Sequence, residues 1–335
     1  MRLVVIADDA NRGLLDDMVP LPEGWQGNLV RERDRAAVRT ALAEAEVVVA
    51  RRFPSWMAQA APHIRLLQVY GGGSDDVALS ALAPSVEVAG TSGYEASVAQ
   101  HAVSLVLALE QNLVAADRAS RRGCRLPGEA GLPPAVELAG RTVGIVGLGN
   151  VGARVAELCR GLFRMRVLAY DPYLTEAEIA ARGAEKVTLD TLLRESHFVS
   201  INCPRNKETL GMISAAHYAL MRPDAYFITT ARGGIHDEAA LAEALADRRI
   251  AGAGLDVWAK EPPEPDHPLL RFDNVLVSPH TAGVTHESRR EMGRYAAEQM
   301  LAVLDGKRPP RLINPEVWGA YRDRFARIRG FAPAA

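Results

Sequence analysis

The sequence has few cysteines, and their arrangement excludes two common kinds of small scaffold. Its 335 residues include only Cys124, Cys159 and Cys203, and none of these belongs to a CxxC pair. This pattern argues against a disulfide framework and against a cysteine-based zinc site. We therefore expect no bound metal and a reducing compartment, the cytoplasm.

The sequence also lacks an excess of charge of one sign and any long hydrophobic run. It has 39 Lys and Arg residues against 41 Asp and Glu residues, a formal net charge of −2. Nucleic-acid binding relies on clustered positive charge, so no nucleic-acid partner is expected. The most apolar helical stretch, residues 98–116, contains charged and amide side chains, whereas a membrane span needs about 20 mainly apolar residues. We expect a soluble protein without a membrane partner.

Short apolar runs alternate with helix-patterned stretches along most of the chain. Most of these runs are continuously apolar, which is typical of strands buried on both faces of a parallel sheet. Their alternation with helices is the signature of βαβ units. We expect strands at residues 3–6, 46–50, 66–70, 86–89, 142–146, 167–170, 198–201, 226–229, 252–257 and 275–277.

The strands form two groups, which predicts an α/β protein with two doubly wound parallel-sheet domains. A long helix at about residues 95–121 and a segment rich in Pro and Gly separate the two groups. A second long helix is expected at residues 286–304, and the short tail after it should pack on the N-terminal domain. The predicted boundaries insert residues 97–284 between residues 1–96 and 285–335, with a ligand cleft between the domains.

A glycine-rich segment, Gly147-Leu148-Gly149-Asn150-Val151-Gly152, matches the GxGxxG pattern of dinucleotide-binding proteins. A predicted strand ends directly before it, and apolar residues at helical spacing follow it. Gly147 permits a tight turn, Gly149 lets the backbone approach a pyrophosphate, and Gly152 lets the helix pack closely on the strand. A glycine-rich turn without a ligand is the alternative, and FAD and S-adenosylmethionine proteins use similar loops.

An acidic residue, Asp171, ends the next predicted strand, 24 residues after Gly147. A carboxylate there accepts hydrogen bonds from the adenosine ribose and repels a 2′-phosphate. Pro172 and Tyr173 follow, with no arginine to receive that phosphate. This pattern favours NAD over NADP and a Rossmann domain at residues 97–284, although Asp171 could simply cap a turn.

Three candidate catalytic residues, Arg232, Glu261 and His280, each follow one of the last three predicted strands. The carboxyl ends of parallel strands share one edge of the sheet, which is also the edge that binds the dinucleotide. We therefore expect the three side chains to converge beside the nicotinamide. Each of them alone could be a structural or solvated residue, but their joint placement favours an active site.

The three residue types suit the oxidation of a 2-hydroxy acid. An arginine binds a substrate carboxylate through two hydrogen bonds. A histidine takes the hydroxyl proton during oxidation and returns it during reduction. A neighbouring carboxylate orients the imidazole and stabilises its charged form. The nicotinamide carries the hydride, so the protein itself has to supply only these three roles for the reaction.

Several segments resemble the motifs of the D-isomer-specific 2-hydroxyacid dehydrogenases. The resemblance covers about residues 65–317, with the motifs in the family's order, and it implies that Arg232, Glu261 and His280 take the catalytic places. It also implies a flavodoxin-like substrate-binding domain formed by residues 1–96 and 285–335. The matching segments are Gly71-Gly72-Gly73-Ser74-Asp75, Val98-Ala99-Gln100-His101-Ala102, Thr230-Ala231-Arg232-Gly233-Gly234, Leu255-Asp256-Val257-Trp258, Glu261-Pro262, Ser278-Pro279-His280-Thr281-Ala282-Gly283 and Asn314-Pro315-Glu316.

The same resemblance implies further ligand contacts and a partner. Asp256 would contact the nicotinamide carboxamide, and backbone N–H groups around Gly72 and Gly73 would contact the substrate carboxylate. The long helix and the arm after it, which includes the segment rich in Pro and Gly, would form a homodimer. The remaining cofactor contacts would be Asn150 and Val151 at the pyrophosphate, Cys203 and Pro204 near the adenine, and Thr230, Ala231, Ala282 and Gly283.

The identity of the substrate stays open. Arg51 and Arg52 follow a predicted strand and could bind a second anionic group, or they could be one solvated arginine and one arginine in a surface ion pair. Phosphoglycerate, glyoxylate, hydroxypyruvate and larger 2-keto acids therefore all remain candidates. An NAD(H)-gated binding protein similar to the family's transcriptional corepressors is the alternative function. We interpret the basic run at residues 322–329 as a solvated helix face.

Overall fold

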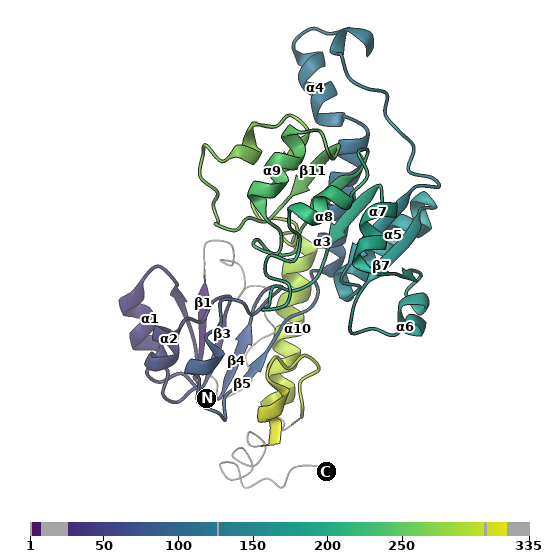
Figure 1. Cartoon of the computed structure of the whole chain (residues 1–335). Coiled ribbons are helices and arrows are strands. Elements are labelled where there is room, and N and C mark those ends of the chain that lie inside the picture. Colours follow the sequence, from purple (N-terminus) through teal and green to yellow (C-terminus); the bar gives the residue numbers. More distant parts are fainter. Residues whose placement is uncertain (1, 8–25, 126, 305–306, 320–335) are drawn as a thin grey trace. The chain divides into compact units, whose positions relative to one another are not determined.

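The computed structural model describes residues 2–7, 26–125, 127–304 and 307–319 of the chain (Figure 1). The chain divides into two compact units. The first unit comprises Met1–Tyr94 and Val284–Ala335, and the second comprises Glu95–Gly283. The polypeptide therefore passes between the units twice.

The first unit contains a sheet of five parallel strands in the order β2-β1-β3-β4-β5. This is the strand order of flavodoxin-like folds. Helices α1 and α2 pack on one face of the sheet, and Gln299 of α10 contacts Gln68 on the other face. The strands are β1 (Arg2–Ala7), β2 (Gln26–Arg31), β3 (Val47–Ala50), β4 (Leu66–Val69) and β5 (Glu87–Ala89); the helices are α1 (Arg35–Leu42), α2 (Ser55–Ala60), η1 (Leu79–Ala81), α10 (His286–Leu304) and η4 (Pro315–Val317).

The second unit contains a sheet of seven parallel strands in the order β12-β11-β10-β9-β6-β7-β8. The order reverses between β6 and β9, as in Rossmann folds. One face packs against α3, α5 and α6, and the other packs against α7, α8 and α9. The strands are β6 (Thr142–Val146), β7 (Arg166–Tyr170), β8 (Glu185–Lys186), β9 (Phe198–Ile201), β10 (Tyr226–Thr229), β11 (Gly252–Leu255) and β12 (Val275–Val277); the helices are α3 (Glu95–Glu110), α4 (Leu113–Arg121), η2 (Pro127–Ala130), α5 (Asn150–Phe163), α6 (Glu176–Ala181), α7 (Leu189–Glu195), α8 (Ala215–Leu220), α9 (Glu238–Ala246) and η3 (Pro268–Arg271).

The predicted fold class is confirmed, with two doubly wound parallel sheets, and each predicted strand is present with small shifts at its ends. Strands β2 and β8 were not predicted. Both lie at sheet edges and are mostly exposed, so they lack the continuous apolar run of a buried strand.

The single helix predicted for residues 95–121 is wrong. The structure has two helices, α3 and α4, separated by a turn at Asn112. Asn112 has φ +50°, a left-handed conformation that asparagine adopts more easily than most residues, and its amide donates to the carbonyl oxygen of Pro133. The helix therefore ends where the arm contacts it.

The tail after α10 packs on the first unit, as expected. The amide of Gly90 donates to the carbonyl of Arg311, and the amide of Ile313 donates to the carbonyl of Val88, so the tail extends the sheet beyond β5. The basic run at residues 322–329 lies outside the described residues.

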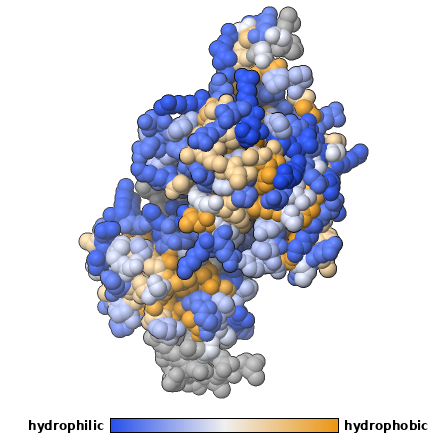
Figure 2. All heavy atoms as spheres, in the orientation of Figure 1, coloured by the Kyte–Doolittle hydropathy of each residue, from blue (hydrophilic) through white to orange (hydrophobic). Residues whose placement is uncertain are grey.

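Hydrophilic residues cover much of the face shown in Figure 2, with smaller groups of apolar residues between them. Among the helices of the described segments, none combines the length and the hydrophobicity that a membrane span requires.

Candidate active site

The glycine turn between β6 and α5 is shaped by close packing at two of its three glycines. Gly147 has φ +88°, and a Cβ there would lie 2.7 Å from the backbone nitrogen of Cys203. A Cβ at Gly152 would lie 2.2 Å from the carbonyl oxygen of Gly147. A Cβ at Gly149, by contrast, would meet no atom of the described residues within 4 Å. Gly149 thus offers an open backbone surface at the start of α5, where free N–H groups attract phosphates.

Buried polar atoms without partners lie near the same edge of the sheet. Asn202 Oδ1, just after β9, and Thr230 Oγ1, just after β10, have no hydrogen-bond partner among the described residues. Buried polar groups are normally paired, so their environment fits a polar ligand at this edge of the sheet. The next residue after Asn202 is Cys203. Its thiol is not a candidate catalytic nucleophile, because burial raises its pKa to about 11.

Asp171 joins the end of β7 to the glycine turn. Its Oδ2 accepts a hydrogen bond from the amide of Leu148 at 3.0 Å, and its Oδ1 accepts one from the amide of Tyr173 at 3.0 Å. Arg182, at the end of α6, donates to the carbonyl oxygen of Leu148. Arg182 lies outside the glycine motif, so no local sequence pattern identifies it. Each Asp171 oxygen retains a further lone pair for a ligand.

His280 and Glu261 form a hydrogen-bonded pair. His280 Nδ1 lies 2.8 Å from Glu261 Oε2, and the amide of Trp258 donates to Glu261 Oε1 at 3.2 Å. Burial would raise the pKa of Glu261, but the hydrogen bonds from His280 and Trp258 and the charges of His280 and Arg232 lower it overall. Glu261 is therefore ionised and accepts a hydrogen bond from the Nδ1–H group of His280. Because Nδ1 binds Glu261, the other ring nitrogen, Nε2, is the candidate atom for proton exchange.

Arg232 lies close to this pair. It follows β10, and its Nη1 donates to the carbonyl oxygen of Ala231 at 2.7 Å. A Cβ at Gly233 would lie 1.7 Å from the carbonyl oxygen of Trp258, so the turn after β10 packs directly on the turn that carries Glu261. The charge of Arg232 also acts on Glu261. The second unit therefore brings the three candidate catalytic residues together.

Asp256 is fully buried, and its carboxylate binds the loop that carries His280. Oδ1 accepts hydrogen bonds from the hydroxyl of Ser278 at 2.6 Å and the amide of Thr281 at 2.9 Å, and Oδ2 accepts one from the amide of Ala282 at 2.9 Å. His101 of α3 contacts Ser278 at 2.9 Å. No local sequence pattern predicts this connection, because His101 and Ser278 are 177 residues apart.

The two adjacent arginines of the first unit have different surroundings. Arg52 forms a 3.1 Å ion pair with Glu32. The side chain of Arg51 lies against the glycine loop, because a Cβ at Gly71 would be 3.5 Å from Arg51 Cγ. In the same loop, the carbonyl oxygen of Gly72 accepts a hydrogen bond from the Tyr94 hydroxyl at 3.3 Å.

Residues 103–282 match the model of the NAD-binding domain of D-isomer specific 2-hydroxyacid dehydrogenases. The chain belongs to this family. It is 38% identical to a D-3-phosphoglycerate dehydrogenase of Archaeoglobus fulgidus, over 76% of this chain and 48% of that protein. It is also 38% identical to a glyoxylate reductase of Korarchaeum cryptofilum, over 77% of this chain and 79% of that protein. The chain thus spans about half of the first relative and most of the second.

A crystal structure of a protein from Thermus thermophilus has a similar fold. It matches this chain with a TM-score of 0.78 and 28% identity, over 93% of this chain and all of that one. Together, these comparisons confirm the predicted family, cofactor and enzyme class. The protein is an NAD-dependent oxidoreductase of the D-2-hydroxyacid dehydrogenase family, which interconverts 2-hydroxy and 2-keto acids.

Proposed function

We propose that the protein acts on a small D-2-hydroxy acid or its 2-keto acid, with His280 and Glu261 as the acid/base pair and Arg232 as the carboxylate anchor. The 2.8 Å contact between His280 Nδ1 and Glu261 Oε2 is the observation that carries the proposal. During oxidation, His280 Nε2 takes the hydroxyl proton, and Glu261 stabilises the resulting imidazolium. During reduction, the same nitrogen returns the proton. The guanidinium of Arg232 holds the carboxylate through its planar fork.

We propose that residues 97–284 bind NAD, which when bound accepts or donates the hydride. The open backbone at Gly149 and the start of α5 support a pyrophosphate site, and the position of Asp171 beside the turn supports a ribose contact. The Thr230 hydroxyl, which has no hydrogen-bond partner in the described part of the chain, supports a further contact. The other residues proposed to hold the cofactor are Gly147, Asn150, Val151, Gly152, Cys203, Pro204, Ala231, Asp256, Ala282 and Gly283.

We propose that residues 1–96 and 285–335 bind the rest of the substrate, with backbone N–H groups at Gly72 and Gly73 contacting its carboxylate. The position of the Arg51 side chain along this loop supports Arg51 as the residue for a second anionic group. Arg51→Gln should then raise KM for phosphorylated or dicarboxylic keto acids. Arg52→Gln is the matched control, and equal effects of the two changes would contradict this assignment.

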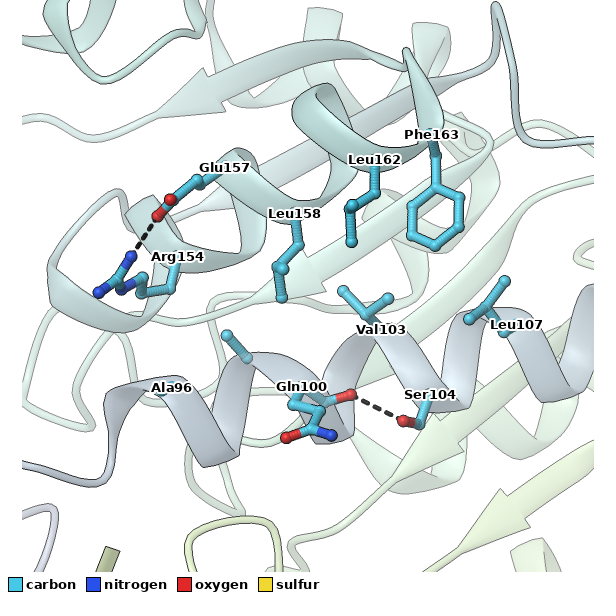
Figure 3. A pocket seen from close by; sticks show the side chains of 11 residues that line it. Ala96, Gln100, Val103, Ser104, Leu107, Arg154, Glu157, Leu158, Leu162 and Phe163 are labelled. Atoms are coloured by element: carbon cyan, nitrogen blue, oxygen red, sulfur yellow. Dashed lines mark hydrogen bonds and ion pairs between the residues drawn. The ribbon is translucent and has the colours of Figure 1, made fainter. Parts of the chain in front are cut away.

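We propose that the protein is a cytoplasmic homodimer that uses α3 and the arm after it. A groove of about 560 Å³ lies between α3 and α5, and apolar side chains of both helices line it, including Val103, Leu107 and Leu158 (Figure 3). Leu162 of α5 also lines the groove and is 69% exposed. Light scattering should give a dimer mass that Leu162→Glu lowers to a monomer mass. Leu210→Glu, at a residue 63% exposed outside the groove, should leave the dimer intact.

The proposed activity is tested with a panel of 2-keto acids, including phosphorylated and dicarboxylic members, mixed with NADH and the purified protein. Loss of the reduced-nicotinamide absorbance with at least one member is expected. If NADH binds but no member is turned over, the result contradicts the proposal and favours the NAD(H)-gated binding protein.

A further inference from the structure

A hydrogen-bond relay leads from helix α3 to the loop that carries His280. His101 Nε2 lies 2.9 Å from Ser278 Oγ, and Ser278 Oγ lies 2.6 Å from Asp256 Oδ1. None of the roles proposed above for acid/base chemistry, carboxylate binding or cofactor binding involves His101 or Ser278. The relay therefore calls for a separate explanation.

The direction of the relay follows from its donors and acceptors. Backbone amides already donate to both oxygens of the Asp256 carboxylate, which therefore acts as an acceptor. Ser278 accordingly donates its single hydroxyl proton to Asp256. Ser278 Oγ can then only accept from His101. His101 Nε2 must consequently carry a proton, whether the ring as a whole is neutral or charged.

The relay ends at the backbone segment around His280, which has an unfavourable conformation. His280 has φ +54°, in the left-handed region that non-glycine residues seldom adopt. Its amide donates to the carbonyl oxygen of Asp256 at 2.8 Å, and the two following amides donate to the Asp256 carboxylate. Strained conformations at functional sites persist when surrounding contacts fix them. Asp256 supplies such contacts to Ser278, which precedes His280, and to the two residues that follow it.

We propose that His101 and Ser278 are positioning residues of the acid/base site. By fixing the Asp256 carboxylate, they hold residues 278–282 in the conformation that directs His280 Nδ1 to Glu261. The kinetic consequence rests on the proposed function, whereas the structural consequences can be measured without turnover.

The structural test uses the full-length protein with ¹⁵N-labelled histidine. The ¹⁵N shifts should show His101 with a protonated Nε2, and a His101 with a bare Nε2 would overturn the proposal. Amide exchange at residues 281 and 282 gives a second readout. Ser278→Ala should speed this exchange at least about tenfold, and Ser278→Thr, which keeps a hydroxyl, should restore slow exchange. Equal exchange in the wild type and Ser278→Ala would also overturn it.

The kinetic test compares the same variants and His101→Leu. Ser278→Ala and His101→Leu should lower kcat about 10- to 100-fold, with KM changed less than about threefold, because misplaced catalytic groups reduce the rate more than they reduce binding. Ser278→Thr should recover most of the rate. Ser214→Ala is the matched control, since it removes a 3.0 Å serine–histidine contact at the start of α8. Unchanged kcat in Ser278→Ala would reject the positioning role, whereas a wild type inactive on every keto acid would reject the proposed function alone.

Discussion

Glu87 in strand β5 makes the stability of the protein depend on pH in a way that can be measured. Its side chain is fully buried, and neither carboxylate oxygen has a hydrogen-bond partner among the described residues. Burial raises the pKa of Glu87 from 4.5 to about 8, although the charge of Arg308 opposes the increase. The folded protein therefore keeps this carboxyl group protonated at pH values where the unfolded chain releases the proton.

The sign and size of the effect follow from this pKa difference. Below pH 4.5, both states hold the proton and Glu87 imposes no penalty. As the pH rises towards 8, only the unfolded state gains by ionising, so the free energy of unfolding falls. One pKa unit corresponds to about 1.4 kcal/mol, so the difference between 4.5 and about 8 amounts to about 5 kcal/mol.

Glu87→Gln removes the ionisable group and keeps its shape. We expect the variant to match the wild type near pH 4.5 and to be more stable at pH 8 by up to about 5 kcal/mol. Urea unfolding followed by circular dichroism at several pH values gives the comparison. Glu243→Gln, which changes an exposed glutamate on α9, is the control and should show no such gain. If Glu87→Gln and the wild type lose stability equally between these pH values, the account of Glu87 is refuted.

Two further predictions concern ligand binding. Arg232→Lys should raise KM for the keto acid steeply, because lysine lacks the planar fork that binds a carboxylate; an unaffected KM in steady-state assays would point to another anchor. Asp171→Ala should reduce the preference for NADH over NADPH, because it removes the charge that repels a 2′-phosphate; an unchanged ratio of the two kcat/KM values would contradict the ribose contact.

The sequence was sufficient to predict the elements that are buried on both faces. Strands such as β6 and β9 appear as continuous apolar runs, whereas the exposed edge strands β2 and β8 carry no such pattern. The break at Asn112 depends on a contact with the arm, at Pro133, which helical periodicity does not reveal.

The same distinction between local sequence patterns and tertiary contacts applies to the candidate site. Arg232, Glu261 and His280 could be predicted together because each follows a strand, and parallel strands end at one edge. The relay through His101 and Ser278 depends on side chains far apart in sequence, so no local pattern reveals it. The different surroundings of Arg51 and Arg52 and the buried carboxyl of Glu87 likewise depend on tertiary packing.

The role of His280 as the acid/base is tested most directly by measuring kcat of His280→Asn together with its NADH affinity. We predict that kcat falls roughly 10²- to 10⁴-fold, because proton transfer is lost, while NADH binds nearly as tightly as to the wild type. An unchanged kcat would show that another group transfers the proton, and the mechanism proposed for the His280–Glu261 pair would be wrong.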